Sequence, residues 1–319
     1  MRQGVYAFFD YKPQTGDMLD EVMAGLRSSP KTLSPKFFYD ERGSALFEQI
    51  TNLNEYYLTR TEMGLFDAHL PEISNIVGNG VCLIEYGSGS SLKIRKVLET
   101  MAVDAYVPID ISEAHLQANA KALHADYPEI DVFPVCADLT QPFELPAACT
   151  DMRKVGFFPG SSIGNFEPAQ AQSFLRVVRE TVGVDGHLII GVDRKKATDV
   201  LEAAYNDVKG VTAEFNLNVL DHINATLGAD FDLNKFSHEA AYNADEGCIQ
   251  MFLTSQETQE VAVAGERVLF SDQERVHTEN SYKYHATEFS ELAGGAGFEV
   301  QKTFSDEREW FSLYLLRGV

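Results

Sequence analysis

The alternation of short apolar runs with amphipathic segments between residues 81 and 193 is the strongest constraint on the fold of this chain. Five runs have the length and composition of buried strands: residues 81–87, 105–110, 130–138, 154–160 and 187–193. Three segments between them repeat apolar residues three and four positions apart, as helices do: residues 91–102, 112–127 and 168–182. Strands that alternate with helices at this spacing form a parallel sheet with helices on both faces. The sequence therefore predicts a doubly wound, mostly parallel α/β core.

The sequence outside this alternation predicts a second domain. The first 60 residues are helical or loop-like and rich in aromatic residues. Residues 196–285 predict a helix at 197–210, continue through 215–228, and then predict a hairpin or meander with strands at 248–255 and 259–265. Residues 286–319 predict a helix and a terminal hairpin that return to the sheet. We expect a core domain and a second α+β domain with these boundaries: residues 61–195 and 286–319 for the core, and residues 1–60 and 196–285 for the second domain.

Composition excludes several classes of partner. The chain has 319 residues, 45% of them hydrophobic, and a formal net charge of −22, so we expect a folded protein with a substantial core. Such an acidic chain does not suit nucleic acid, which requires clustered Lys and Arg. No apolar run approaches the roughly 18 residues of a membrane span, and the first 22 residues lack a secretory signal pattern. We expect a cytoplasmic protein without a nucleic-acid or membrane partner.

Metal binding has little support in the sequence. The four cysteines lie far apart, and no two of the eight histidines have the spacing of a metal-binding pair on one helix. We therefore expect no metal site.

The loop after the first strand contains two glycines. Gly87 and Gly89 follow the strand at the edge of the sheet where ligands bind in doubly wound folds, and glycine lets the backbone come close to a ligand. A dinucleotide fingerprint requires a third glycine where this chain has Leu92. A nicotinamide oxidoreductase is therefore the weakest candidate.

Carboxylates at three successive strand ends indicate the ligand class. Glu85 precedes the loop, Asp110 ends the second strand and Asp138 follows the third. Each acid alone is more often a helix cap or a turn residue, but together they suit a nucleoside with a positively charged group. S-adenosylmethionine fits, with its ribose diol at Asp110 and its adenine amine at Asp138.

A second glycine-rich stretch, residues 157–168, follows the fourth strand and contains Asn165. The amide of Asn165 can donate to a carboxylate and accept from an amine, which suits the backbone of an amino acid. An asparagine that turns the chain before the helix at Pro168 is an equal alternative on this feature alone.

Six segments together closely resemble the S-adenosylmethionine-dependent histidine Nα-methyltransferases of the ergothioneine pathway: residues 34–62, 85–93, 159–168, 230–233, 246–253 and 277–284. The similarity extends over nearly the whole chain from about residue 20. It implies a Rossmann-like methyltransferase core, a substrate-binding second domain, a monomer, and trimethylation of L-histidine to hercynine.

The resemblance also implies the roles of individual residues. Tyr39 lies next to the methionine part of the cofactor, and the other cofactor-binding residues are Gly87, Lys93, Asp110, Asp138 and Leu139. Asn165 and Tyr205 grip the α-carboxylate and amine of the substrate. Tyr56, Glu279 and Ser281 read the imidazole ring. The residues that shape the same pocket are Phe47, Gly160, Ser162 and Met251. Leu139 stands where an aromatic residue is common, and Ser162 where threonine is usual.

Glu279 argues most directly for histidine. A buried imidazole has two nitrogens that need partners, and leaving one unpaired costs about 1 to 3 kcal/mol. A glutamate and a tyrosine hydroxyl satisfy both, whereas a pocket for tryptophan gains from an apolar residue at this position. Two alternatives stay open: methylation of another amino acid or amine, and a non-catalytic protein that binds the cofactor or an amino acid.

The chemistry expected is an in-line displacement on the methyl group, which depends mainly on positioning. The amine must lose a proton before each transfer. Asn165 cannot act as a base, and Tyr39 or a chain of waters is a weaker hypothesis than release of the proton to solvent.

Overall fold

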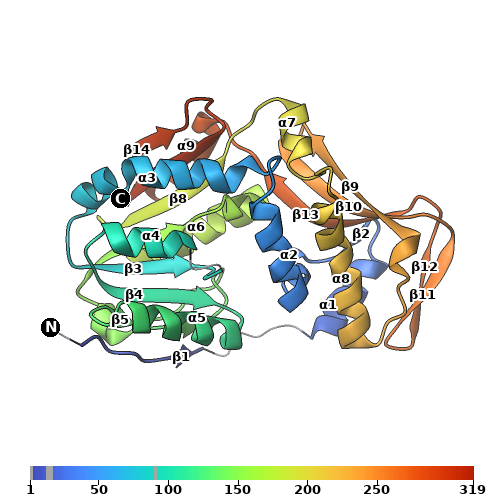
Figure 1. The fold of residues 1–319 in the computed structure, drawn as a ribbon, viewed down its shortest axis with the longest axis horizontal. Helices are drawn as coiled ribbons and strands as arrows, with labels where there is room; N and C mark the ends of the chain where they lie inside the picture. Colours follow the sequence, from blue (N-terminus) through green and yellow to red (C-terminus); the bar gives the residue numbers. More distant parts are fainter. Residues whose placement is uncertain (1–2, 12–16, 90–91) are drawn as a thin grey trace. The chain divides into compact units, whose positions relative to one another are not determined.

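The computed structural model describes residues 3–11, 17–89 and 92–319. The chain divides into two compact units (Figure 1). Unit 1 comprises residues 1–14, 60–195 and 284–319, and unit 2 comprises residues 15–59 and 196–283. Ser90 and Ser91, in the loop that the sequence singles out, lie outside the described residues.

The described part of unit 1 is built on a nine-stranded sheet. Its strands are β1 (Phe9–Asp10), β3 (Val81–Tyr86), β4 (Val103–Asp110), β5 (Asp131–Val132), β6 (Val135–Cys136), β7 (Arg153–Phe158), β8 (His187–Asp193), β14 (Phe298–Ser305) and β15 (Phe311–Gly318). Its helices are α3 (Tyr57–Val77), α4 (Leu92–Thr100), α5 (Glu113–Asp126), α6 (Pro168–Val182) and α9 (Ala286–Gly294), with short 3-10 turns η2 (Ala147–Cys149) and η3 (Ser162–Asn165).

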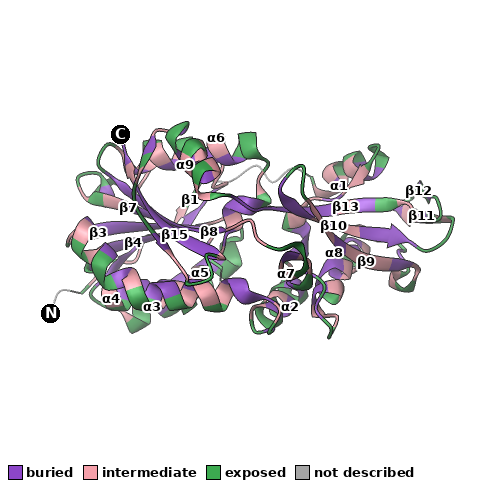
Figure 2. Cartoon of the chain, turned by 90° about the horizontal axis from the view of Figure 1, so that it is seen from above, coloured by how far each residue is buried: buried purple, intermediate pink, exposed green. Residues whose placement is uncertain are grey.

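The order of the strands confirms the predicted doubly wound, mostly parallel sheet. The order is β1-β6-β4-β3-β7-β8-β15-β14, with β5 beside β4, and β15 runs antiparallel to both of its neighbours. Helices α3, α4 and α5 lie along one face and α6 and α9 along the other, and the strands between them are buried (Figure 2). The chain moves from β3 to β4 and β6 on one side and to β7 and β8 on the other. The carboxyl end of β3 is therefore the switch point, beside which ligands bind in such sheets.

Two segments of unit 1 differ from the sequence-based expectation. The third predicted strand is divided into β5 and β6, because Pro134 between them has no N–H to donate to the ladder. Residues 3–11, expected in the second domain, join the large sheet instead, where β1 pairs in parallel with β6. The amide N–H of Phe9 donates to Pro134 O at 2.9 Å, so this edge of the sheet is covered by main-chain pairing.

The described part of unit 2 combines a four-stranded sheet with a two-stranded one. The larger sheet has the order β2-β13-β10-β9, with β2 (Lys31–Thr32), β13 (Arg275–Tyr282), β10 (Cys248–Ser255) and β9 (Phe236–Asn243). The smaller one pairs β11 (Gln259–Val263) with β12 (Glu266–Phe270). The helices are α1 (Met18–Arg27), α2 (Glu41–Thr51), α7 (Thr198–Ala203) and α8 (Val211–Leu227), with η1 (Pro35–Phe38) and η4 (Leu233–Lys235).

The two strands expected at 248–255 and 259–265 are present, but their expected pairing in a hairpin or meander is wrong. These runs form β10 and β11, which belong to different sheets, and β10 pairs with β9 and β13 instead. Strand β9 was not predicted because only two of its eight residues are buried, so its sequence lacks a regular alternation. The terminal hairpin is confirmed, since β14 and β15 pair antiparallel.

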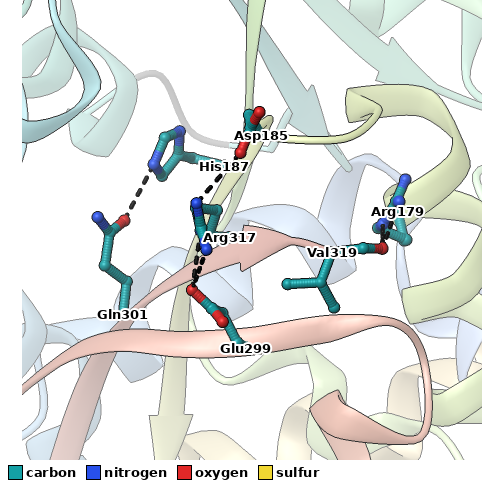
Figure 3. Close-up of polar contacts among 7 residues, drawn as sticks. All are labelled: Arg179, Asp185, His187, Glu299, Gln301, Arg317 and Val319. Carbon is teal, nitrogen blue, oxygen red and sulfur yellow. Dashed lines mark hydrogen bonds and ion pairs between the residues drawn. The ribbon is translucent and has the colours of Figure 1, made fainter.

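A cluster of polar residues joins β8, β14 and β15 at the end of the sheet opposite to the carboxyl end of β8 (Figure 3). Arg317 donates to Glu299 at 2.8 Å and to Asp185 at 3.2 Å, and the ring of His187 is 3.0 Å from the Gln301 side-chain oxygen. These contacts fix the antiparallel end of the sheet, at a distance along β8 from the ligand-binding edge.

We expect the packing of α9 on this sheet to be essential for stability. Phe289 of α9 is fully buried, and its ring centroid lies 4.6 Å from that of Tyr314 on β15. Phe289→Ala should lower the free energy of unfolding by about 3 to 5 kcal/mol, because it leaves a cavity. Urea denaturation followed by circular dichroism measures this loss, with the exposed Val184→Ala as the control. Equal midpoints for the two variants would contradict the prediction.

Candidate functional site

The loop after β3 has the backbone that a close ligand requires. Gly87 has a φ of +77°, which disfavours any other residue, and its N–H donates to Ile109 O at 2.9 Å. Among the described residues, a Cβ at this position would meet only Leu139 Cδ2, at 3.8 Å. The structure therefore brings together Gly87 and Leu139, two of the predicted cofactor-binding residues.

Asp110 and Asp138 each accept a hydrogen bond from the main-chain N–H two residues later. Asp110 Oδ1 accepts from the N–H of Ser112 at 2.9 Å, and Asp138 Oδ1 accepts from the N–H of Thr140 at 2.9 Å and from its hydroxyl at 2.6 Å. In each residue one oxygen shapes the turn after the strand. Among the described residues no side chain donates a hydrogen bond to the Oδ2 atom of either. Desolvation raises the pKa of Asp110, opposed by the Ser112 N–H. Both acids thus combine a turn-forming oxygen with one that is available to a ligand.

Glu85 is a buried acid rather than a ligand-facing one. Its side chain is 3% exposed and accepts a hydrogen bond from the hydroxyl of Tyr106. Burial raises its pKa to about 7, opposed by the Tyr106 hydrogen bond and by the charge of Lys93. Ser88, Gly89 and Asn119 line a small cavity beside it. Glu85 therefore lies in the interior beside the glycine loop, with the Tyr106 hydroxyl as its hydrogen-bond partner.

Lys93 and Gly160 meet at a residue that the sequence analysis did not identify. The carboxylate of Glu62, on α3, is fully buried and lies 2.7 Å from Lys93 Nζ. Both of its oxygens accept from the N–H of Gly160, at 2.8 and 3.0 Å. A predicted cofactor-binding residue and a predicted pocket residue therefore share one carboxylate.

The loop after β7 presents Asn165 at its end. Gly160 and Ser161 both have positive φ values, +83° and +59°, so the backbone reverses sharply after the strand. The N–H of Asp193 donates to Ser161 Oγ at 2.9 Å, and Ser162 Oγ donates to Pro159 O at 3.1 Å. Asn165 closes η3 with an exposed side chain that makes no hydrogen bond to the described residues. Its amide is thus available to a ligand.

Aromatic rings gather in unit 2 around Phe215 of α8. The ring centroids of Tyr39 and Phe47 lie 5.7 and 5.9 Å from that of Phe215, and those of Tyr39 and Phe47 lie 5.9 Å apart. The ring centroids of Phe47 and Tyr56 lie 6.4 Å apart, and those of Tyr56 and Tyr205 lie 6.2 Å apart. Four predicted site residues thus form one continuous cluster that Phe215, not predicted, supports.

A buried lysine organises the hydroxyls beside this cluster. Lys283 is 1% exposed, and its Nζ lies 3.0 Å from the Tyr205 hydroxyl and 2.9 Å from Ser281 Oγ. An ammonium group only donates, so both oxygens accept from it. The two hydroxyls also share a hydrogen bond of 2.8 Å. Tyr205 and Ser281, both predicted to bind substrate, are therefore held in fixed orientations by Lys283.

Glu279 lies on β13 directly opposite Met251 of β10. Its side chain is 8% exposed, and no described residue donates a hydrogen bond to its carboxyl group. Burial raises the pKa of Glu279 to about 7, and the positive charge of Lys283 partly opposes the shift. A buried carboxyl group without a hydrogen-bond partner is costly, so it indicates a position where a ligand supplies the partner.

Tyr39 lies near this acid but differs from it in exposure. Desolvation, followed by the charges of Glu279 and Tyr205, raises the pKa of Tyr39. The side chain is 46% exposed, which weakens the effect of desolvation, but either contribution keeps the phenol protonated at neutral pH. Tyr39 is therefore a hydrogen-bonding group rather than a base.

The predicted site residues divide between the units. Unit 1 contains Gly87, Lys93, Asp110, Asp138, Leu139, Gly160, Ser162 and Asn165, and unit 2 contains Tyr39, Phe47, Tyr56, Tyr205, Met251, Glu279 and Ser281. Sequence reasoning missed Glu62, Phe215 and Lys283. Glu62 and Lys283 lie in two of the segments that carry the resemblance, and charged residues in such segments were the signal that could have found them. Within the described ranges, no His, Cys, Asp and Glu side chains group as metal ligands, and no helix has the length and apolarity to cross a membrane.

Comparisons with known proteins are consistent in pointing to one family. Residues 18–318 match the family model described as histidine-specific methyltransferase, SAM-dependent. The chain is 38% identical to the histidine N-alpha-methyltransferase of Mycolicibacterium smegmatis and 36% identical to that of Mycobacterium tuberculosis. Each alignment covers 92% of this chain and 93% of the relative. It is 30% identical to ergothioneine biosynthesis protein 1 of Neurospora crassa, over 91% of this chain and 33% of that longer protein.

The buried Glu279 makes stability depend on pH in the ligand-free protein. Its folded pKa of about 7 exceeds the ordinary value of 4.5. The free energy of unfolding is therefore highest, as far as Glu279 is concerned, below about pH 4.5. It falls by about 3 kcal/mol in all as the pH rises from about 4.5 through 7. Glu279→Gln removes this titration, so the melting temperature of the variant should rise relative to the wild type between pH 5 and 8. Differential scanning calorimetry at several pH values measures the difference, with the exposed Glu266→Gln as control. A difference that stays constant with pH, or falls, would refute the prediction.

Proposed function

The chain belongs to the family of S-adenosylmethionine-dependent, histidine-specific methyltransferases, and we infer that it is an enzyme that methylates the α-amine of L-histidine. Its cofactor is S-adenosylmethionine. We propose three successive transfers that give hercynine, in keeping with the relative that is named for ergothioneine biosynthesis. We also propose that the enzyme acts as a monomer in the cytoplasm, where its four free, buried cysteines stay reduced.

The residues of unit 1 fit the cofactor by their chemistry. The available Oδ2 atoms of Asp110 and Asp138 suit hydroxyl and amine donors, and the backbone at Gly87 leaves room for a ligand beside Leu139. We propose that these residues, with Lys93, hold the cofactor. When bound, S-adenosylmethionine supplies an electrophilic methyl group next to a positive sulfur. Leu139 would pack against the adenine as an apolar side chain in place of a stacked ring.

The single observation that carries the histidine assignment is Glu279. Its carboxyl group is buried, has a pKa near 7, and lacks a hydrogen-bond donor among the described residues. An imidazole ring also titrates near this pH, so a proton can be shared between the two at neutral pH. We propose that Glu279, Tyr56 and Ser281 read the ring. An indole has one N–H and no acceptor nitrogen, so it would leave more of the polar groups in the pocket without a hydrogen-bond partner.

The reacting amine needs orientation and deprotonation. We propose that Asn165 and Tyr205 hold the amine and α-carboxylate, with Lys283 fixing the Tyr205 hydroxyl. Phe47, Met251, Gly160 and Ser162 would shape the pocket. Because the Tyr39 phenol stays protonated at neutral pH, it orients rather than removes a proton. Release of the proton to solvent before each transfer is the simplest route. Catalysis then rests on positioning and on exclusion of water.

We expect the purified protein to methylate histidine and no other standard amino acid. Incubation with S-adenosylmethionine and each of the twenty amino acids, followed by mass spectrometry, should yield a histidine product that gains up to three methyl groups. A product from another amino acid would keep the cofactor assignment and refute the imidazole pocket. Binding of the cofactor without any product would support a non-catalytic binding protein instead.

Glu279→Ala should raise the KM for histidine about 10- to 100-fold, because one imidazole nitrogen loses its partner. The KM for S-adenosylmethionine should change little, since Glu279 is assigned only to the substrate. Steady-state kinetics with each substrate varied in turn separates the two effects. Glu266→Ala removes an exposed carboxylate from the same unit and is the matched control. An unchanged KM for histidine would remove Glu279 from the imidazole site.

A further inference from the structure

We propose that Glu62 is a positioning residue that couples the loop after β7 to Lys93, and that productive cofactor binding depends on this coupling. The inference rests on the proposed function, because Lys93 is assigned there to the cofactor and the loop after β7 to the substrate. Glu62 touches neither ligand in this assignment. It acts through two other residues.

The contacts of Glu62 connect three elements of unit 1. It lies on α3, and its carboxylate pairs at 2.7 Å with Lys93 Nζ from the start of α4. Its two oxygens accept from the N–H of Gly160 at 2.8 and 3.0 Å, at the beginning of the loop that ends in Asn165. One carboxylate thus fixes both a side chain beside the glycine loop and the backbone of the acceptor loop.

The surrounding backbone leaves space for this carboxylate. A Cβ at Gly191 of β8 would lie 2.0 Å from Glu62 Oε1, so any larger residue at Gly191 would displace the carboxylate. A Cβ at Gly160 would lie 3.1 Å from Lys93 Nζ, and the φ of Gly160 is +83°. Glycine at both positions therefore lets the carboxylate and the ammonium approach the main chain closely.

Burial strengthens the interaction between the charges of Glu62 and Lys93. The Glu62 side chain is fully buried and that of Lys93 is 17% exposed, so neither charge is screened well by water. Removing one partner of such a pair leaves the other charge uncompensated. Without Glu62, the Lys93 ammonium would turn toward solvent, away from its place beside the loop.

The loop has a second anchor that does not depend on Glu62. Ser161 Oγ accepts from the main-chain N–H of Asp193 at 2.9 Å, which holds the same turn against β8. We therefore expect the loop to stay folded when Glu62 is changed, with its start loosened and Lys93 misplaced. A purely structural residue would instead affect stability without a selective effect on cofactor binding.

Glu62→Gln separates the two contacts. The glutamine oxygen can still accept from Gly160, but the neutral amide cannot compensate the charge of Lys93. We expect the KM for S-adenosylmethionine to rise at least about 10-fold in Glu62→Gln, with a smaller change in kcat. Glu62→Ala loses both contacts, and its kcat/KM should fall at least about 100-fold. Glu72→Gln is the matched control, because Glu72 lies on the same helix and pairs with Lys302 at the surface.

A double-mutant cycle tests whether Glu62 acts through Lys93. If it does, Glu62→Gln combined with Lys93→Met should raise the KM for S-adenosylmethionine no more than Lys93→Met alone. Additive effects in this cycle would overturn the proposal. The cycle uses the full chain and also decides the matter if Glu62→Ala fails to fold.

A measurement on the ligand-free protein gives a readout besides activity. Hydrogen exchange of peptides that span residues 158–166 should be faster in Glu62→Ala than in the wild type and nearly normal in Glu62→Gln. The affinity for S-adenosylmethionine is measured by calorimetry. If both Glu62 variants show the same hydrogen exchange and the same affinity as Glu72→Gln, the coupling is refuted, whether or not the wild type methylates histidine. A wild type without activity would refute the proposed function alone.

Discussion

The reversal of strand order at β3 is the constraint on which the rest of unit 1 depends. Because the chain continues to β4 on one side and to β7 on the other, the loops after these three strands emerge at one edge of the sheet. Asp110 lies at the end of β4, Gly87 after β3 and Gly160 after β7. In the ligand-free protein, the fold thus places a carboxylate acceptor and two glycine-containing loops at the same edge of the sheet. Glu62 reaches this edge from α3 and connects the loops that the sheet topology brings there.

Unit 2 holds buried polar groups of β13 and the residue that follows it, namely Glu279, Ser281 and Lys283. Lys283 aligns the hydroxyls of Tyr205 and Ser281, and the ring of Tyr205 lies next to that of Tyr56 in the aromatic cluster. A buried ammonium group is tolerated here because oxygen acceptors are close to it. The register of β10 and β13, with a bulge after Met251, places Glu279 opposite a flexible apolar side chain. A flat ligand with polar edges suits such surroundings better than a wholly apolar one.

Much of this arrangement was predictable, and the failures have physical reasons. Alternating apolar runs predicted the parallel sheet because strands buried on both faces must be apolar throughout. The same rule missed β9, which is mostly half-buried, and could not foresee that β1 would join the sheet through two residues. Glu62 was missed because a glutamate in an amphipathic helix usually faces solvent, and its partner Lys93 is 31 positions away in the chain. Sequence spacing shows neighbours on one helix, but not a pair that two loops and a sheet bring together. The residue-by-residue roles came from resemblance and stay predictions.

Three buried glutamates show how the cost of an acid in the interior can be met in different ways. Glu62 has a lysine and a main-chain N–H, so its charge is compensated within the protein. Glu85 has the Tyr106 hydroxyl and a pKa of about 7, so its cost falls when it takes up a proton. Glu279 has the same raised pKa but receives no hydrogen bond from the described residues. The first two acids are complete without a ligand, whereas the third is not. A ligand that brings a hydrogen-bond donor to Glu279 would remove a cost that the free protein carries, and an analogue without that donor would leave it in place. Selectivity at this position therefore follows from the instability of the unliganded site as much as from attraction to the ligand.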